Sequence, residues 1–241
     1  MESNKDFSYQ RVIQLDDAET ASRKYLANVF LWMFGALVIS AFCAYEFASN
    51  LNLLKLIITP TGFTPLGLVV VFSPLAFSLV MSFGFNRISY PLMVLLFITY
   101  AVLIGISLSI FALIYTATSL FTVFLTASGI FAAMSIAGYT TKMDLTGFGS
   151  IMYMLFIGIL IASLVNFFIG SESLSYIISY IGVAVFTGLT AYYIQMLKRI
   201  GEGVEFGDAS GKKLIIIGAF VLYTTFINLF LSLLRIFGRR R

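Results

Sequence analysis

Polar side chains recur on one face of the last apolar segment of the chain, residues 214–237. Thr225, Asn228 and Ser232 follow i, i+3, i+7 spacing, which aligns them as one stripe on a helix. Hydroxyl and amide groups in an apolar helix suit two kinds of chemistry: hydrogen bonds between helices, or an uncharged path for water and ions. We favour hydrogen bonds between helices, because polar residues within apolar spans often face neighbouring helices.

Three more polar residues are expected to lie near this stripe, at the centre of the bundle that the apolar helices would form. Thr224 precedes Thr225 in the last segment, and Tyr193 and Gln195 lie in the segment before it. Together with the stripe they form a candidate central site that has no charged group.

Glu46 is the acidic residue that lies deepest in an apolar segment, near the end of residues 27–47. Charged side chains within a membrane are costly, so such a residue is a functional candidate. Its place close to a helix end fits exposure at the membrane interface equally well, and both interpretations stay open.

Residue types that the sequence lacks exclude most catalytic chemistry. The chain has no histidine and one cysteine, Cys43, which excludes Ser/His and Cys/His nucleophiles and histidine-based zinc sites. An intramembrane aspartyl protease needs aspartates within its spans, and a retinal protein needs a lysine in its last helix; neither is present. We therefore expect a protein that is not an enzyme and that binds neither a cofactor nor a metal ion.

The composition is that of an integral membrane protein. Hydrophobic residues make up 60% of the chain and charged residues 11%, and the mean hydropathy is +0.99. The net charge of +4 comes from Lys and Arg beside the apolar segments. That arrangement is typical of membrane topology signals, and we expect the bilayer as a partner and no nucleic acid.

Seven apolar segments are long enough to predict membrane spans. They are residues 27–47, 66–82, 92–110, 113–137, 151–168, 174–197 and 214–237. The predicted fold is an all-α membrane protein with seven transmembrane helices in one bundle over residues 27–241, preceded by a polar tail, residues 1–26, with a short interfacial helix. Pro74 is expected to kink the second span unless neighbours pair with the freed carbonyl. Phe111-Ala112 is expected to separate the third span from the fourth.

Small residues spaced by four predict close contacts between some of these spans. The patterns are Gly129/Ala133/Ala137, Gly158/Ala162 and Ala184/Gly188.

Basic residues predict which side of the membrane each loop faces. The N-terminal tail and the loops on its side carry ten Lys and Arg, and the other side carries five. Since basic loops stay in the cytoplasm, the N-terminus is predicted to be cytoplasmic. The C-terminal arginines would then lie outside, and a re-entrant last segment is the alternative to a full span.

Four sequence segments carry a resemblance to a known family. Residues 139–147 read YTTKMDLTG, residues 161–166 read IASLVN, residues 190–195 read TAYYIQ, and residues 222–235 read LYTTFINLFLSLLR. These segments closely resemble the Bax inhibitor (transmembrane Bax-inhibitor-motif) family, in its bacterial type, over about residues 20–241. Lys142 and Asp144 lie in the loop of the first motif.

The resemblance implies a seven-helix bundle whose last helix runs through the middle. It also implies a bacterial inner membrane, a calcium or cation leak, protection against stress and, in some bacteria, regulation of a membrane-bound AAA protease. Calcium or protons would be the permeant ions.

The chain departs from the family at two positions. Family members that conduct calcium in a pH-dependent way carry an aspartate in the sixth helix and another in the seventh, and the matching residues here are Tyr193 and Thr225. A carboxylate pair can titrate near neutral pH and supplies the oxygens that calcium prefers, whereas a phenol and a hydroxyl do neither. We expect a leak that has lost its pH sensor, or else a protein that regulates a membrane protease by binding it.

Overall fold

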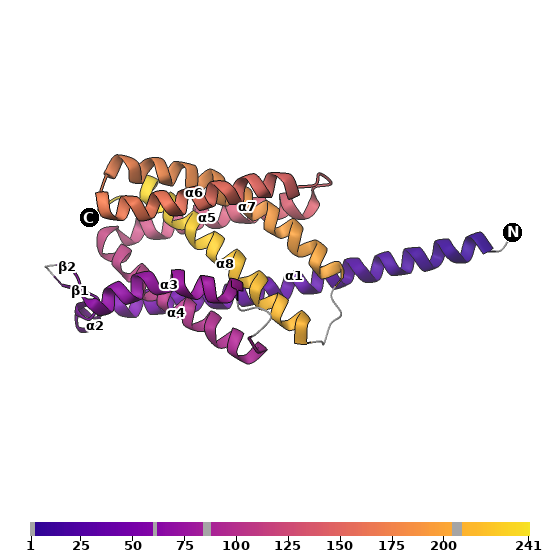
Figure 1. Cartoon of the computed structure of the whole chain (residues 1–241), viewed down its shortest axis with the longest axis horizontal. Helices are drawn as coiled ribbons and strands as arrows, with labels where there is room; N and C mark the ends of the chain where they lie inside the picture. The colour runs from indigo at the N-terminus through magenta and orange to yellow at the C-terminus, as the bar shows by residue number, and fades with distance from the viewer. Residues whose placement is uncertain (1–2, 60–61, 84–87, 204–208) are drawn as a thin grey trace.

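The computed structural model describes residues 3–59, 62–83, 88–203 and 209–241. Its elements, in chain order, are α1 (Ser3–Ser49), α2 (Leu51–Lys55), β1 (Ile58–Thr59), β2 (Gly62–Phe63), α3 (Pro65–Phe83), α4 (Tyr90–Ile114), α5 (Ala117–Thr140), α6 (Thr146–Ile169), α7 (Glu172–Glu202) and α8 (Ala209–Phe237). The two short strands pair antiparallel, with Ile58 opposite Phe63. The all-helical fold class is confirmed (Figure 1).

Six helices in the described part of the chain are long and apolar enough to cross a membrane. They are α1 from Ala18, α4, α5, α6, α7 and α8 from Ser210. The described apolar part of α3, Pro65–Met81, is shorter. The chain is therefore an integral membrane protein, and its described residues form six helices of spanning length where the sequence predicted seven.

The polar N-terminal residues from Ser3 onward belong to the same helix as the first apolar segment. A separate short helix was expected there, but no proline or glycine interrupts the chain before Gly35, so α1 continues without a break. Whether this polar part lies at the membrane interface stays a prediction.

Pro74 lies inside α3, and the carbonyl group that it deprives of a partner is hydrogen-bonded by serines. Ser73 Oγ donates to the Val70 carbonyl oxygen at 3.0 Å, and Ser107 Oγ of α4 reaches the same oxygen at 3.4 Å. Because the one hydroxyl hydrogen of Ser107 lies closer to the Leu103 carbonyl oxygen, at 2.9 Å, Ser73 in the same helix is the main partner of the freed carbonyl. The helix continues through the proline.

The boundary between α4 and α5 lies at Tyr115 and Thr116, a few residues beyond the Phe111-Ala112 boundary predicted from the sequence. Thr116 caps α5 through its side chain, which accepts a hydrogen bond from the Ser119 N–H. The C-terminal residues pair with the same turn, since the Arg241 N–H donates to the Ile114 carbonyl oxygen at 2.9 Å. Phe111-Ala112 offers no comparable cap, so the helix passes through it.

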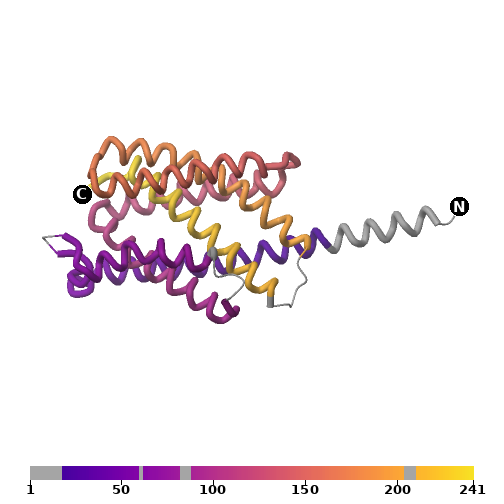
Figure 2. The backbone as a smooth tube through the Cα atoms, viewed as in Figure 1, coloured from indigo at the N-terminus to yellow at the C-terminus, as the bar shows by residue number. Residues whose placement is uncertain are grey.

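Helix α8 packs against α1, α4, α5 and α7. Figures 1 and 2 show it crossing obliquely between α1, α3 and α4 on one side and α5, α6 and α7 on the other. In its most apolar stretch 61% of the residues are buried, against 6% in α6. Helix α8 thus contributes much of the buried core, and α6 lies at the outside of the bundle.

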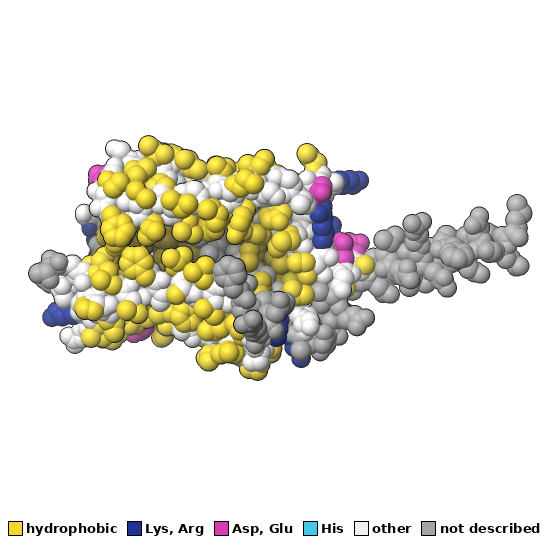
Figure 3. Space-filling model, viewed as in Figure 1, with side chains coloured by type: hydrophobic (Ala, Val, Ile, Leu, Met, Phe, Trp, Pro, Cys, Tyr) yellow, Lys and Arg dark blue, Asp and Glu magenta, His cyan; other side chains and the backbone are white. Residues whose placement is uncertain are grey.

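The outer surface of the bundle is apolar. Large side chains such as Phe34 and Phe168 are 67% and 79% exposed. On the face seen in Figure 3, hydrophobic side chains cover the flanks of the helices, and charged ones lie toward the two ends. This distribution suits a protein surrounded by lipid.

Candidate functional site

The centre of the bundle holds a hydroxyl group that joins three helices. Ser40 Oγ of α1 lies 2.6 Å from the Tyr223 Oη of α8 and 2.7 Å from the Ala101 carbonyl oxygen of α4. It also lies 3.0 Å from the Ala36 carbonyl oxygen in its own helix. Because a serine hydroxyl has one hydrogen, Ser40 donates to a carbonyl oxygen and accepts from Tyr223.

A second hydroxyl pair lies beside the first. Thr224 Oγ1 is 3.3 Å from Tyr100 Oη of α4, and the rings of Tyr100 and Tyr223 meet edge to face at 5.8 Å between centroids. Sequence reasoning named Thr224 but missed Ser40, Tyr100 and Tyr223. These three residues could have been selected from the sequence, because each is a hydroxyl residue inside an apolar span. A buried hydroxyl in such a span needs a hydrogen-bond partner.

The polar stripe hydrogen-bonds mainly within its own helix. Thr225 Oγ1 donates to the Val221 carbonyl oxygen at 2.8 Å, and Asn228 Nδ2 donates to the Thr224 carbonyl oxygen at 2.9 Å. Within the described residues neither side chain is hydrogen-bonded to a neighbouring helix, so hydrogen bonds between helices stay a prediction for these two residues. Hydroxyl and amide groups reach the carbonyl four residues earlier without any partner helix. Ser232 instead lies against Gly182 of α7.

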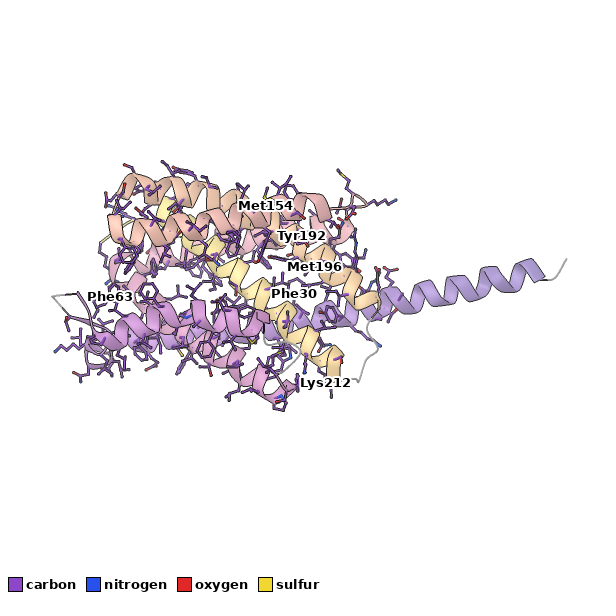
Figure 4. All side chains as sticks on the ribbon, viewed as in Figure 1. Phe30, Phe63, Met154, Tyr192, Met196 and Lys212 are labelled. Carbon is purple, nitrogen blue, oxygen red and sulfur yellow. The ribbon has the colours of Figure 1, made fainter. Side chains whose placement is uncertain are left out.

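Tyr193 and Thr225 are not hydrogen-bonded to each other in the described residues. The half-buried ring of Tyr193 contacts Tyr192, with 5.3 Å between centroids. Helices α7 and α8 run antiparallel, with Gly218 beside Leu197. This register places Tyr193 about one helical turn from the level of Thr225. Neighbouring Tyr192 packs on α6 and is labelled in Figure 4.

Gln195 binds the loop between α5 and α6. Its Oε1 accepts a hydrogen bond from the Leu145 N–H at 2.8 Å, and its Nε2 donates to the Met143 carbonyl oxygen at 2.7 Å. Both partners are backbone groups outside the helices, which explains why a buried amide is tolerated here. Its expected place at the centre of the bundle is wrong, and Gln195 instead anchors the loop that carries the family motif.

Asp144 in that loop forms an ion pair with Arg199 of α7, with 2.8 Å between Oδ1 and the guanidinium. The Thr146 hydroxyl donates to the same oxygen at 2.7 Å. Hydrogen bonds from Thr146 and Arg199 lower the pKa of Asp144 to about 2. The carboxylate therefore stays charged at neutral pH, and Lys142 beside it is exposed.

Glu46 lies in the last turn of α1 with an exposed side chain. It is not part of the hydroxyl cluster around Ser40. In the described residues, no group of three His, Cys, Asp or Glu could hold a metal ion.

A cavity of about 510 Å³ reaches the hydroxyl cluster from one end of the bundle. Ser49 and Arg241 line it at that end, and Ser40 lines it at the centre. Its wall from α8 is apolar and includes Phe226 and Phe230. At the centre of the bundle Phe226 meets Phe131 of α5 edge to face, at 5.5 Å between centroids.

Long apolar helices, a lipid-facing surface and a buried cluster of hydroxyls without acids define a polytopic membrane protein. Comparison with known proteins gives the family. Residues 22–241 match the family described as "Inhibitor of apoptosis-promoting Bax1". The chain belongs to this Bax inhibitor family.

Relatives from several bacteria match almost the whole chain. It is 45% identical over 218 residues to "Inner membrane protein YbhL" of Escherichia coli (strain K12), covering 90% of this chain and 92% of that protein. It is 43% identical over 219 residues to "Uncharacterized protein RP147" of Rickettsia prowazekii, covering 91% of each. An uncharacterized protein of Caulobacter vibrioides is 36% identical over 242 residues, covering 97% of each.

Proposed function

We propose that the chain spans a bacterial inner membrane seven times, with α8 at the centre of the bundle and the N-terminus in the cytoplasm. A relative that is 45% identical is named an inner membrane protein. The 19 residues of α3 extend about 28 Å at 1.5 Å per residue, close to the thickness of a hydrocarbon core. The packing of α8 against four other helices supports its central place.

We propose further that the protein is not an enzyme and provides a leak for small cations that contributes to stress protection. The observation that carries this proposal is the Ser40 hydroxyl, which is hydrogen-bonded to Tyr223 and lines the inner end of the cavity whose other end is lined by Arg241. Hydroxyl oxygens can replace part of the water around a cation, and the Phe131–Phe226 contact would act as an apolar constriction. Calcium prefers carboxylate oxygens, so a site of hydroxyls alone would bind it weakly and let it leave.

The leak is expected to be independent of pH. Purified protein in liposomes should pass protons or calcium faster than protein-free liposomes, and the flux should stay constant between about pH 6 and 8, because neither Tyr193 nor Thr225 titrates in that range. Flux is measured with dyes that report calcium or pH inside the liposomes. The double variant Tyr193→Asp with Thr225→Asp should introduce pH dependence.

Two outcomes would contradict this proposal. Flux no greater than that of protein-free liposomes would exclude the leak. A steep pH dependence in the wild type would mean that another acid controls it, and Glu46→Gln then tests whether that acid is Glu46.

Regulation of a membrane-bound AAA protease, or of membrane quality control, is the second candidate function. The family-motif loop favours it, because the loop is held in one shape yet leaves residues free for contact. Gln195 and the Asp144–Arg199 ion pair fix the loop, while Met143 at its tip is 74% exposed. An ordered loop with an exposed apolar tip and charged neighbours suits binding to another protein.

Site-specific photo-crosslinking tests this second function. A photoreactive residue at Met143 should crosslink a membrane-bound AAA protease in native membranes, because the loop presents this side chain outside the bundle. The same residue at Phe168, which is equally exposed on α6, should not. Mass spectrometry identifies the crosslinked protein. Equal crosslinking from both positions, or none to a protease, argues against the regulator.

A further inference from the structure

A second cavity, of about 650 Å³, lies between α1 and α5 at the end of the bundle that carries Arg23. Both helices pack against α7 and α8, but they make at most a few contacts with each other. Phe30 of α1, labelled in Figure 4, lines one wall, and Phe131 of α5 lines the other. The space is therefore an apolar cleft between two membrane helices.

The cleft is open toward the surrounding lipid. Phe34 and Ile136 line it from opposite helices, and they are 67% and 65% exposed. Both lie within helices of spanning length. A molecule already dissolved in the bilayer can therefore enter the cleft from the side, without passing through water.

Two buried hydroxyl groups line this cleft, Ser135 Oγ and Tyr139 Oη. Ser135 Oγ has no hydrogen-bond partner within the described part of the chain. Tyr139 Oη has none there besides the neighbouring Arg23 guanidinium, a donor that leaves the phenol hydrogen free for an acceptor. Ser135 and Tyr139 are four residues apart on α5, so their backbones lie about 6 Å apart along the helix axis. Buried hydroxyl donors without an acceptor are costly, which points to a ligand with two acceptor groups at different depths.

The mouth of the cleft carries positive charge. The Arg23 guanidinium lines the cleft beside the Tyr139 hydroxyl. Lys198 lies behind this tyrosine: its Nζ is 4.6 Å from the centroid of the Tyr139 ring and donates to the Tyr139 carbonyl oxygen at 3.2 Å. Glu19 is the acid paired with Arg23, at 2.6 Å. Two cations against one acid favour an anionic head group at this position.

We propose that this cleft binds an anionic glycerophospholipid of the surrounding bilayer. Its phosphate lies at the mouth, where Arg23 and the Tyr139 hydroxyl donate to the phosphate oxygens. Ser135, one turn deeper, donates to an ester carbonyl oxygen, and an acyl chain fills the apolar space beside Phe30 and Phe131. The order of phosphate, ester and hydrocarbon in a phospholipid matches the order of the groups along α5. The proposal does not depend on whether the protein conducts ions.

Native mass spectrometry of the full-length protein in detergent tests the head-group part of the proposal. The probes are phosphatidylglycerol and phosphatidylcholine with identical acyl chains. The wild type should retain phosphatidylglycerol in preference, and Arg23→Gln should lower that preference about fivefold, the effect of removing one basic residue near an anionic head group.

Lys24→Gln is the matched control, since it removes the same charge from an exposed neighbour that does not line the cleft. It should leave the preference unchanged. An equal loss in both variants would mean general attraction to basic protein and would overturn the proposal, as would a wild type that shows no preference.

A second pair of variants tests the cavity itself. Ala132→Trp fills the cleft and should reduce retention of both lipids at least tenfold, whereas Ala133→Trp, next in the chain and also exposed, does not line it. Both variants should remain folded, because each residue is exposed. Undiminished lipid retention in Ala132→Trp would overturn the proposal.

Discussion

Gly138→Ala is expected to destabilise the protein by about 3 kcal/mol, at the upper end of the range for overpacked sites, and to lower its Tm by about 10 °C. A methyl group at this position of α5 would lie only 2.3 Å from the Ala191 carbonyl oxygen and 2.8 Å from the Ala191 Cα of α7. Both atoms belong to the backbone, so no rotation of a side chain can relieve the contact. The two helices must move apart, and Tm in detergent reports the loss.

Gly129→Ala is the matched control, because Gly129 lies in the same helix with nothing within 4 Å of an added methyl group. This change should leave Tm unchanged or raise it slightly, since alanine favours a helix over glycine by about 1 kcal/mol. Equal Tm values for both variants would mean that α5 and α7 are not closely packed at Gly138.

Gly138 and Gly129 show that the spacing of small residues in the sequence does not predict which glycines contact another helix. The pattern of small residues selected Gly129, Gly158 and Gly188. Only Gly188 lies against another helix, where it meets Phe148 of α6, and the other two have nothing within 4 Å of an added methyl group. Spacing by four identifies residues that share a helix face, but it does not tell which face meets a neighbour. Gly105 and Gly138 lie against the backbones of α1 and α7, and they belong to none of the predicted patterns.

The helices themselves were largely predictable, because the length of an apolar segment determines whether it can cross a bilayer. Each of the seven predicted segments corresponds to one long helix, from α1 to α8 without the short α2. The predicted ends of these helices were less accurate where a capping residue determines the end. Thr116 supplies such a cap with help from the C-terminal residues, which are distant in the sequence.

The candidate site was only partly predictable, because the partners of a polar side chain depend on packing between helices. Thr225 and Asn228 share one face as expected, yet they hydrogen-bond within α8. Tyr223, adjacent to the stripe, makes the contact to Ser40 instead. The periodicity of one helix predicts which residues share a face, and only the arrangement of α1 and α4 around that face determines which hydroxyls pair.

The two ends of α8 are expected on opposite sides of the membrane. Near its start the Tyr25 hydroxyl donates to the Leu214 carbonyl oxygen, and near its end Arg240 pairs with Glu172 at the start of α7. Gly201 near the end of α7 lies against Tyr25, whereas Glu172 is the first residue of this helix. Since α7 is long enough to span, the two contacts lie at opposite ends of the bundle. The loop between α7 and α8 belongs to the more basic side, which favours the cytoplasm.

Cysteine labelling of intact cells measures this arrangement in a Cys43→Ser background. A cysteine at the exposed Ser210 should be shielded from a membrane-impermeant reagent, whereas one added after Arg241 should react fully, because only the second faces outward. Lys142→Cys, expected to be shielded, and Glu172→Cys, expected to react, provide a second pair at the same two ends. The reverse labelling would place the N-terminus outside. If Ser210→Cys and the added C-terminal cysteine are both shielded while Glu172→Cys reacts, α8 is re-entrant and the seven-span topology is wrong.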